Sequence, residues 1–231
     1  MKKETSTYHS GQTPGILKLK KQLEFDRDTQ EAVWSALEAL TAPELEIRQQ
    51  GFDSLLEKDV VRKSPLVVYV LATRLLEPEI QLRRRIVGCL AELISPAPGD
   101  PPPAGAALTY LNGYLSQMRK RPIFALLQVA GFDPESSKQV GTLLKACSFA
   151  GNQLSQILVD HTAPIPIRRQ AITFTSQIGF LVAIPALERM VRRIEARVSP
   201  GELLNLSNAE LEDEASLLPY MKEALVRLQA L

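Results

Sequence analysis

Apolar residues recur at intervals of three and four along most of the chain, in segments separated by proline or glycine. This spacing places them on one face of an α-helix and predicts a series of amphipathic helices. Asp28 is expected to cap the first helix. Because no segment alternates convincingly between apolar and polar residues, no β-strand is expected and the predicted fold class is all-α. Helices are expected at residues 29–40, 43–56, 65–76, 78–94, 108–118, 121–131, 168–178, 184–198 and 219–228.

A further apolar pattern begins at Pro134 and keeps its phase across Gly151. We expect it to form one long or gently kinked helix that ends before Pro164. Helices that are neighbours in sequence are expected to pair as antiparallel hairpins, with 29–40 beside 43–56, 65–76 beside 78–94, and 108–118 beside 121–131.

A short motif recurs at the start of several of these helices: a proline followed a few residues later by an arginine. Pro43 is expected in the first turn of its helix, where a missing amide proton costs nothing. Repetition of one motif at the same place in successive hairpins predicts stacked helix pairs, each too small to bury its apolar face alone. The motif pairs are Pro43 with Arg48, Pro78 with Arg83, and Pro164 with Arg168.

Composition along the chain indicates how it is divided. Residues 1–25 are polar and are expected to form a flexible N-terminal segment, followed by one helical repeat domain at 26–231. The proline-rich stretch 95–105 cannot continue a helix and predicts a stiff loop, either within the domain or at a boundary. The acidic segment 202–214 is either a solvated surface or a cover for a basic surface of the same chain.

The Pro-then-Arg openings, the small residues Gly51 and Ala171 that follow them, and the sequence Ile-Pro-Ala-Leu at 184–187 resemble HEAT-repeat proteins, which are related to armadillo arrays. The resemblance implies a right-handed α-solenoid of about five helical hairpins. It also implies that Arg48, Arg83 and Arg168 are structural, contributing polar contacts to an acidic residue of a neighbouring repeat. The third motif departs from the family pattern, because Ile165 and Ile167 stand where an acidic residue is usual.

The charge and cysteine content narrow the function classes. Basic and acidic side chains nearly cancel, 27 against 26, so no global field favours nucleic acid or an anionic membrane. The two cysteines, Cys89 and Cys147, lie in apolar helical patterns and are expected to be buried thiols in a reducing compartment. With no secretory signal and no spanning segment in the sequence, we expect a soluble, cytoplasmic protein with no membrane partner.

Residues suited to catalysis are sparse. The chain has two histidines, His9 and His161. On a single helix, Cys147 and His161 would lie about 21 Å apart, too far for a nucleophile and its base. The sequence has no spaced Cys and His motif for a metal and no glycine-rich loop for a phosphate. We therefore expect no enzyme activity, no metal and no cofactor.

The favoured function is a noncatalytic scaffold or adaptor that binds a protein or peptide. The resemblance to the family implies that the second helix of each hairpin lines the concave side. These second helices open at Pro43, Pro78, Pro122 and Pro164. Arg84, Arg85 and Arg169 are the expected contacts for an acidic partner, and replacing Arg84 and Arg85 with glutamate is expected to weaken binding without lowering the melting temperature. The alternative is nucleic-acid binding by aligned basic clusters, as in the HEAT-like alkylpurine DNA glycosylases. An enzyme or enzyme accessory is the third hypothesis, and it needs a polar cluster in the groove.

Overall fold

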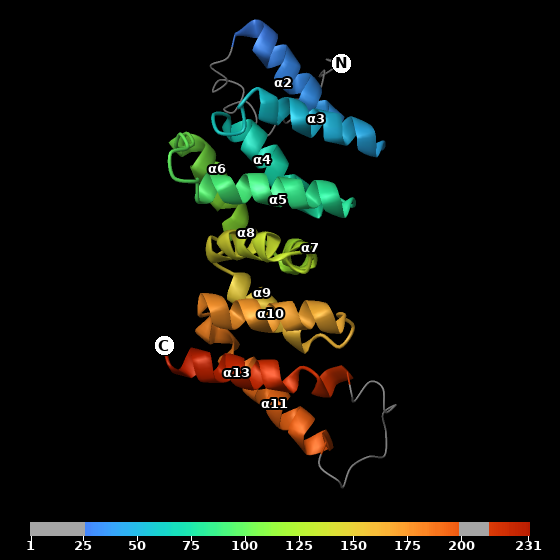
Figure 1. Ribbon diagram of the computed structural model, residues 1–231, viewed down its shortest axis with the longest axis vertical. Coiled ribbons are helices and arrows are strands. Elements are labelled where there is room, and N and C mark those ends of the chain that lie inside the picture. The colour runs from blue at the N-terminus through green and yellow to red at the C-terminus, as the bar shows by residue number, and fades with distance from the viewer. Residues whose placement is uncertain (1–25, 199–212) are drawn as a thin grey trace, which may run out of the picture.

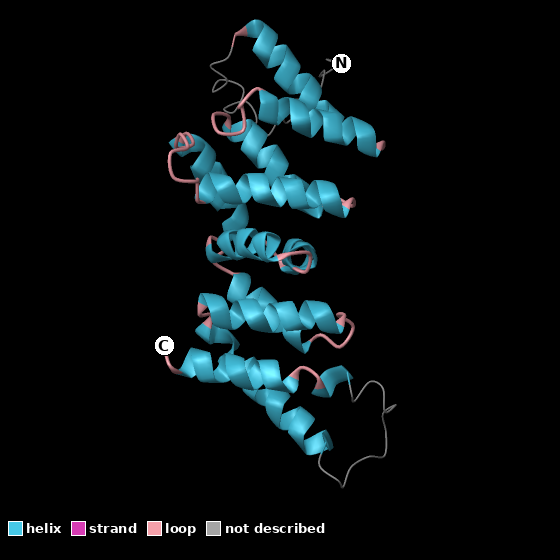
Figure 2. Ribbon diagram, viewed as in Figure 1, coloured by secondary structure: helices cyan, strands magenta, loops and turns pink. Residues whose placement is uncertain are grey.

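A computed structural model describes residues 26–198 and 213–231. Within these two ranges the regular structure is entirely helical, with eleven α-helices, two short 3₁₀ turns and no strand (Figure 2). The predicted all-α class is therefore confirmed. The N-terminal segment 1–25 and residues 202–212 of the acidic segment lie outside the described residues.

Most of the predicted helices are present, and their bounds differ from the expected ones by a few residues. The α-helices are α2 (Arg27–Ala39), α3 (Leu45–Glu57), α4 (Pro65–Thr73), α5 (Ile80–Ile94), α6 (Gly105–Ser116), α7 (Lys120–Ala130), α8 (Pro134–Lys145), α9 (Ala150–Val159), α10 (Ile165–Ile178), α11 (Ile184–Val198) and α13 (Leu218–Gln229). The 3₁₀ turns are η1 (Arg74–Leu76) and η2 (Leu181–Ala183).

The helices are stacked along the long axis of the molecule, broadly in the order of the chain, except that α13 lies between α10 and α11 (Figure 1). The α2–α3 hairpin lies at one end, and α11 and α13 lie at the other. One continuous cluster of buried apolar side chains runs from Val33 in α2 to Leu228 in α13. This core is unbroken across the proline-rich loop.

Two of the predicted hairpins form, but the third does not. The pairs α2–α3 and α4–α5 are in contact, whereas α6 packs mainly against α4 and α7 packs against α8. The expected pairing of 108–118 with 121–131 is therefore wrong. The physical reason lies in the loop before α6, which Arg62 holds beside the start of α4. The Arg62 guanidinium donates hydrogen bonds to the carbonyl of Pro101 and the carboxylate of Asp100. The backbone carbonyl of Arg62 accepts a hydrogen bond from the Ala104 amide.

The expected long helix after Pro134 is also wrong, because the chain turns at residues 146–149 and separates α8 from α9. Cys147 in this turn is buried, and so is Ala150 at the start of α9. The apolar pattern keeps its phase because the turn itself belongs to the core, so periodicity alone does not reveal the break. Gly151 then allows η2 to approach, since a Cβ atom there would lie 2.7 Å from Val182 Cγ1.

The helix starts show which polar groups act as caps. Asp26, and not Asp28 as predicted, caps α2, because its carboxylate accepts hydrogen bonds of 2.9 Å from both the amide and the hydroxyl of Thr29. Pro43 and Pro78 lie in the turns just before the N-cap residues of α3 and α5, and Pro164 is itself the N-cap of α10. The expectation that Pro43 stands in the first helical turn is therefore off by two residues.

Candidate functional site

Arg48, Arg83 and Arg168 occupy the same helical position, four residues after the N-cap of α3, α5 and α10 respectively. All three are buried, with exposed fractions of 7%, 8% and 1%. A buried guanidinium must be hydrogen bonded if the fold is to be stable. The recurring position therefore points each arginine inward, between one layer of helices and the next.

Glu77, which lies between η1 and α5, is the main partner of Arg48. One carboxylate oxygen accepts hydrogen bonds of 3.1 Å from Arg48 Nε and 2.9 Å from Arg48 Nη2. The other accepts a bond of 2.7 Å from Arg74 Nη2. Burial alone would raise the pKa of Glu77, but the hydrogen bonds from Arg74 and Arg48 outweigh it and hold this pKa below its ordinary value.

Arg83 has a different set of partners, and no carboxylate of the described residues is among them, contrary to the acidic partner that the resemblance implies. Its Nε donates to the carbonyl of Glu77 over 2.6 Å, and its Nη1 donates to Gln128 Oε1 over 2.7 Å. Gln128 belongs to α7, so this contact joins α5 to the next layer.

Arg84, Arg85 and Arg169 follow the buried arginines in sequence, and each stacks on an aromatic ring from another helix or loop. Their guanidinium carbons lie 4.7, 5.0 and 5.0 Å from the ring centres of Phe132, Phe52 and Tyr220 respectively. We call these three arginines and their three aromatic partners the arginine face; Phe132 and Tyr220 are exposed, whereas Phe52 is buried in the core beneath Arg85. An arginine stacked on a ring keeps the N–H donors at its edge available for other groups.

Two members of the arginine face also form ion pairs within the chain. Arg84 pairs with Asp133 and hydrogen bonds to Ser136 of α8, and Arg85 pairs with Asp53 of α3. Arg169 is exposed, and no carboxylate of the described residues pairs with it. It is therefore the member with the most free capacity to bind an acidic group.

The arginine face borders two hollows in the surface. One, of about 620 Å³, lies between α3, α5 and α8 and is lined in part by Phe52, Arg84 and Arg85. The second, of about 570 Å³, is lined in part by Phe132 and Arg169. Since Arg84 lines the first and its stacking partner Phe132 lines the second, the two hollows adjoin at this stack.

The aromatic members of this face were not predicted from the sequence. Phe132 lies 48 residues after Arg84, and Tyr220 lies 51 residues after Arg169. No local spacing identifies such pairs, because they depend on which helices become neighbours in the fold.

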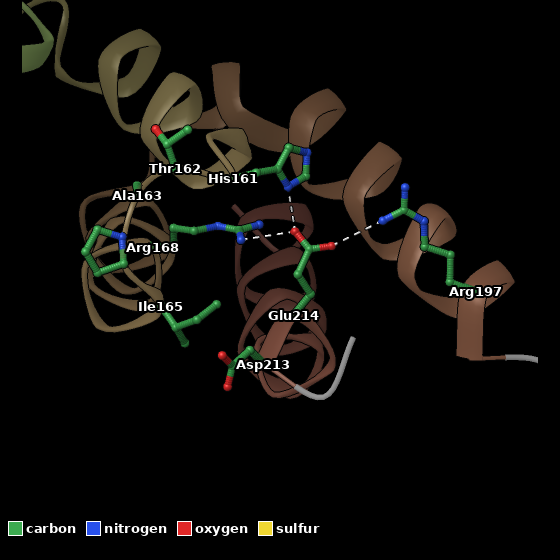
Figure 3. A pocket seen from close by; sticks show the side chains of 9 residues that line it. His161, Thr162, Ala163, Ile165, Arg168, Arg197, Asp213 and Glu214 are labelled. Atoms are coloured by element: carbon green, nitrogen blue, oxygen red, sulfur yellow. Dashed lines mark hydrogen bonds and ion pairs between the residues drawn. The ribbon is translucent and has the colours of Figure 1, made fainter. Parts of the chain in front are cut away.

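A second candidate site lies near the C-terminus, around the carboxylate of Glu214 (Figure 3). Arg168 and Arg193 approach its Oε1 at 3.1 and 3.4 Å, and Arg197 approaches its Oε2 at 3.5 Å. His161 Nδ1 lies 2.7 Å from Oε1. Burial would raise the pKa of Glu214, but the bond from His161 and the charges of the arginines outweigh it and lower this pKa.

The hydrogen bonds of His161 indicate its tautomer. Arg193 Nη1 lies 2.8 Å from His161 Nε2, and a guanidinium can only donate. His161 Nε2 is therefore the acceptor, and the proton is on Nδ1, which donates to Glu214. The imidazole is a neutral bridge between Arg193 and Glu214.

We call the cavity beside this cluster the C-terminal pocket. Its volume is about 480 Å³, and it is lined by His161, Thr162, Ala163, Pro164, Ile165, Arg168, Arg197, Asp213 and Glu214. The sequence leaves open whether the acidic segment is a solvated surface or a cover for a basic surface of the same chain. Glu214 agrees with the second alternative, because its carboxylate contacts arginines of the same chain.

Cys147 and His161 do not form a nucleophile and base pair, and His9 lies outside the described residues. Cys147 lies in the α8–α9 turn, His161 follows α9, and the partners of His161 are Glu214 and Arg193. Burial raises the pKa of the Cys147 thiol, and burial raises the pKa of Cys89 to about 12. A thiol with a raised pKa is a poor nucleophile at neutral pH.

Residues 26–198 and 213–231 contain neither a metal-binding cluster nor a membrane-spanning helix. No group of three or more His, Cys, Asp or Glu side chains in these ranges is arranged to hold a metal ion. None of the helices in the same ranges is both long enough and apolar enough to cross a bilayer.

Comparison of the chain with protein-family models, curated proteins and solved structures finds no match.

Proposed function

We propose that the protein is a noncatalytic interaction scaffold, and that its stacked helices form a right-handed HEAT-like α-solenoid of about five hairpins. The buried arginine at one helical position in α3, α5 and α10 supports a repeat, because a repeated motif then has a repeated structural role. A stack of helix layers offers an extended surface to a partner.

The arginine face is the proposed binding surface, and the stacking of its three arginines is the observation that carries the proposal. Arginine and aromatic residues are enriched at protein interfaces and contribute most of their binding energy. Holding each guanidinium against a ring fixes it in place before binding, so less conformational entropy is lost on association. The partner that suits this surface is a protein or peptide with acidic side chains.

Nucleic acid is a less suitable partner for the same surface. Asp133 and Asp53 accompany Arg84 and Arg85, and their carboxylates repel phosphate groups. Elsewhere, Lys120 pairs with Asp160 and Arg192 lies near Glu188. Four members of the basic clusters, Arg84, Arg85, Lys120 and Arg192, therefore each have an acidic neighbour.

The ion pairs change the choice of test variants. Glutamate at position 84 or 85 would face an aspartate, and two like charges in contact destabilise a fold. We therefore expect this double replacement to lower the melting temperature, contrary to the expectation from sequence. Arg169→Glu is the cleaner variant, because Arg169 has no carboxylate partner among the described residues.

The test begins with affinity capture from the native host, using the wild-type protein as bait, and continues with titration of the purified partner. Arg169→Glu should weaken the complex by about tenfold or more, as truncation of an interface arginine often does. Arg189→Glu is the matched control, with the same charge change at an exposed side chain of α11 that pairs with no carboxylate of the described residues. Equal weakening by both variants, or by neither, would contradict the proposed surface. A mobility-shift titration with DNA at low salt tests the alternative.

A further inference from the structure

We propose that the C-terminal pocket binds a phosphate monoester or free phosphate, and that Glu214 is a built-in carboxylate that occupies this oxyanion site. The inference is independent of the arginine face, because the residues of the two sites do not overlap.

The first argument is an excess of positive charge. Arg168, Arg193 and Arg197 converge on the single carboxylate of Glu214, and His161 bridges to it as a neutral group. Around the Glu214 carboxylate, three positive charges and one negative charge leave an excess of two; Asp213 adds a further negative charge at the edge of the pocket. A phosphate dianion is the common biological group whose charge matches this excess.

Glu77 provides an internal comparison. It is also held by arginines, Arg48 and Arg74, but the side chain of Glu77 is 0% exposed. That of Glu214 is 13% exposed and lines the C-terminal pocket, and it has one arginine more. The Glu77 cluster is thus closed and structural, whereas the Glu214 cluster opens on a cavity.

The second argument is a pair of unused hydrogen-bond donors. Arg168 Nη2 and Arg193 Nε are buried and have no hydrogen-bond partner among residues 26–198 and 213–231. The Arg168 side chain is 2% exposed, so water does not readily satisfy its free N–H groups. A carboxylate has two oxygens for this cluster, and a phosphate monoester brings three terminal oxygens that accept strong bonds.

The third argument is the arrangement of the pocket walls. Arg168 and Arg197 approach Glu214 from opposite sides, and His161 approaches from a third direction (Figure 3). Asp213 lies at the edge of the pocket, with its carboxylate away from both guanidinium groups (Figure 3). An oxyanion in place of the Glu214 carboxylate would therefore meet donors on three sides.

The test uses the full-length chain and inorganic phosphate, at constant ionic strength near neutral pH. Binding is followed by NMR through the ring signals of His161, assigned with a His9→Gln variant. Glu214→Gln keeps the shape of the side chain and removes the competing charge, so it should bind phosphate about tenfold more tightly than the wild type or better. Adding Arg197→Gln to that variant should reverse the gain.

Two controls keep the result interpretable. Circular dichroism establishes that each variant is folded, and phosphate should also raise the melting temperature of the wild type more than acetate does at equal ionic strength. Saturable binding that depends on both Glu214 and Arg197 supports the proposal. Absence of saturable phosphate binding to Glu214→Gln, or binding that Arg197→Gln leaves unchanged, overturns it.

A final comparison distinguishes the source of the phosphate group. A phosphoserine peptide and its unphosphorylated form are titrated alongside inorganic phosphate. Tighter binding of the phosphopeptide than of inorganic phosphate assigns the site to phosphorylated proteins, and equal or weaker binding assigns it to small phosphate compounds.

Discussion

Arg48 of α3 and Glu77, which precedes α5, are joined by two hydrogen bonds of 3.1 and 2.9 Å to the same carboxylate oxygen. The Arg48 side chain is 9% exposed and that of Glu77 is 0% exposed. Arg48 Nη1 also donates to the carbonyls of Ala42 and Pro43, which belong to the turn that precedes its own helix. One guanidinium thus ties the α2–α3 turn to the start of the next layer.

Removal of one member of this pair should be strongly destabilising. Glu77→Leu leaves the buried guanidinium of Arg48 without its anion, and we expect a loss of about 3–5 kcal/mol in the free energy of unfolding. The double variant Arg48→Met, Glu77→Leu should recover much of this loss, since two apolar groups replace the pair. Urea unfolding of both single variants, the double variant and the wild type completes the cycle. Additive effects would show that the two residues are not coupled.

Acid should destabilise the protein through Glu77 and Glu214, whose pKa values are both lowered in the folded state. A carboxyl with a lowered folded pKa stabilises the fold above its unfolded pKa, which is 4.5 for glutamate, and that contribution is lost as the pH falls toward the folded pKa. Urea unfolding between about pH 6 and pH 3 measures the slope. The Glu77→Gln variant should be less stable than the wild type at about pH 6, and it should lose less stability than the wild type as the pH falls to about 3. A slope equal to that of the wild type would exclude Glu77 as a contributor.

Gly51 marks the closest approach of α2 and α3. A Cβ atom at this position would lie 2.7 Å from the carbonyl oxygen of Ala36 and 2.8 Å from the Cβ of Ala39. Gly51→Ala should therefore force the two helices apart and cost about 1–3 kcal/mol. Gly113→Ala in α6 is the matched control, because a Cβ there meets nothing within 4 Å. That replacement should stabilise the protein by about 0.5–1 kcal/mol, through helix propensity alone. Thermal unfolding of both variants gives the comparison, and opposite signs are expected.

The two cysteines should be protected in the native state. Cys147 is buried, whereas Cys89 is only half-buried, contrary to the expectation from sequence, although burial raises its pKa to about 12. Because the thiolate is the reactive form, reaction with an aromatic disulfide reagent near pH 8 should be slow for the native protein. In denaturant both thiols should react quickly. Rapid native labelling of Cys147 would contradict its burial, and rapid labelling of the half-buried Cys89 would contradict its raised pKa.

The helices themselves were largely predictable, because their signals are local. Ser64 caps α4 by accepting a hydrogen bond from the Val67 amide, three residues away. Gly179 ends α10 with a φ of 88°, a backbone conformation that favours glycine. Pro134 opens α8, as its fixed φ allows. The recurrence of arginine after proline was visible for the same reason, since it needs only residues close in sequence.

The sequence by itself therefore determined the all-helical class, most helix positions and the recurrence of arginine after proline, whereas the burial of these arginines appeared only in the structure. Only the tertiary structure decided that α6 packs on α4, that the chain turns between α8 and α9, and that Glu214 meets Arg168. Arg168 and Glu214 are 46 residues apart, and Arg84 and Phe132 are 48 apart. Such contacts depend on which apolar faces bury each other, and many pairings of similar leucine-rich faces satisfy the same periodicity. Helix formation depends on residues that are close in sequence, whereas the candidate sites depend on tertiary contacts between residues that are far apart in sequence.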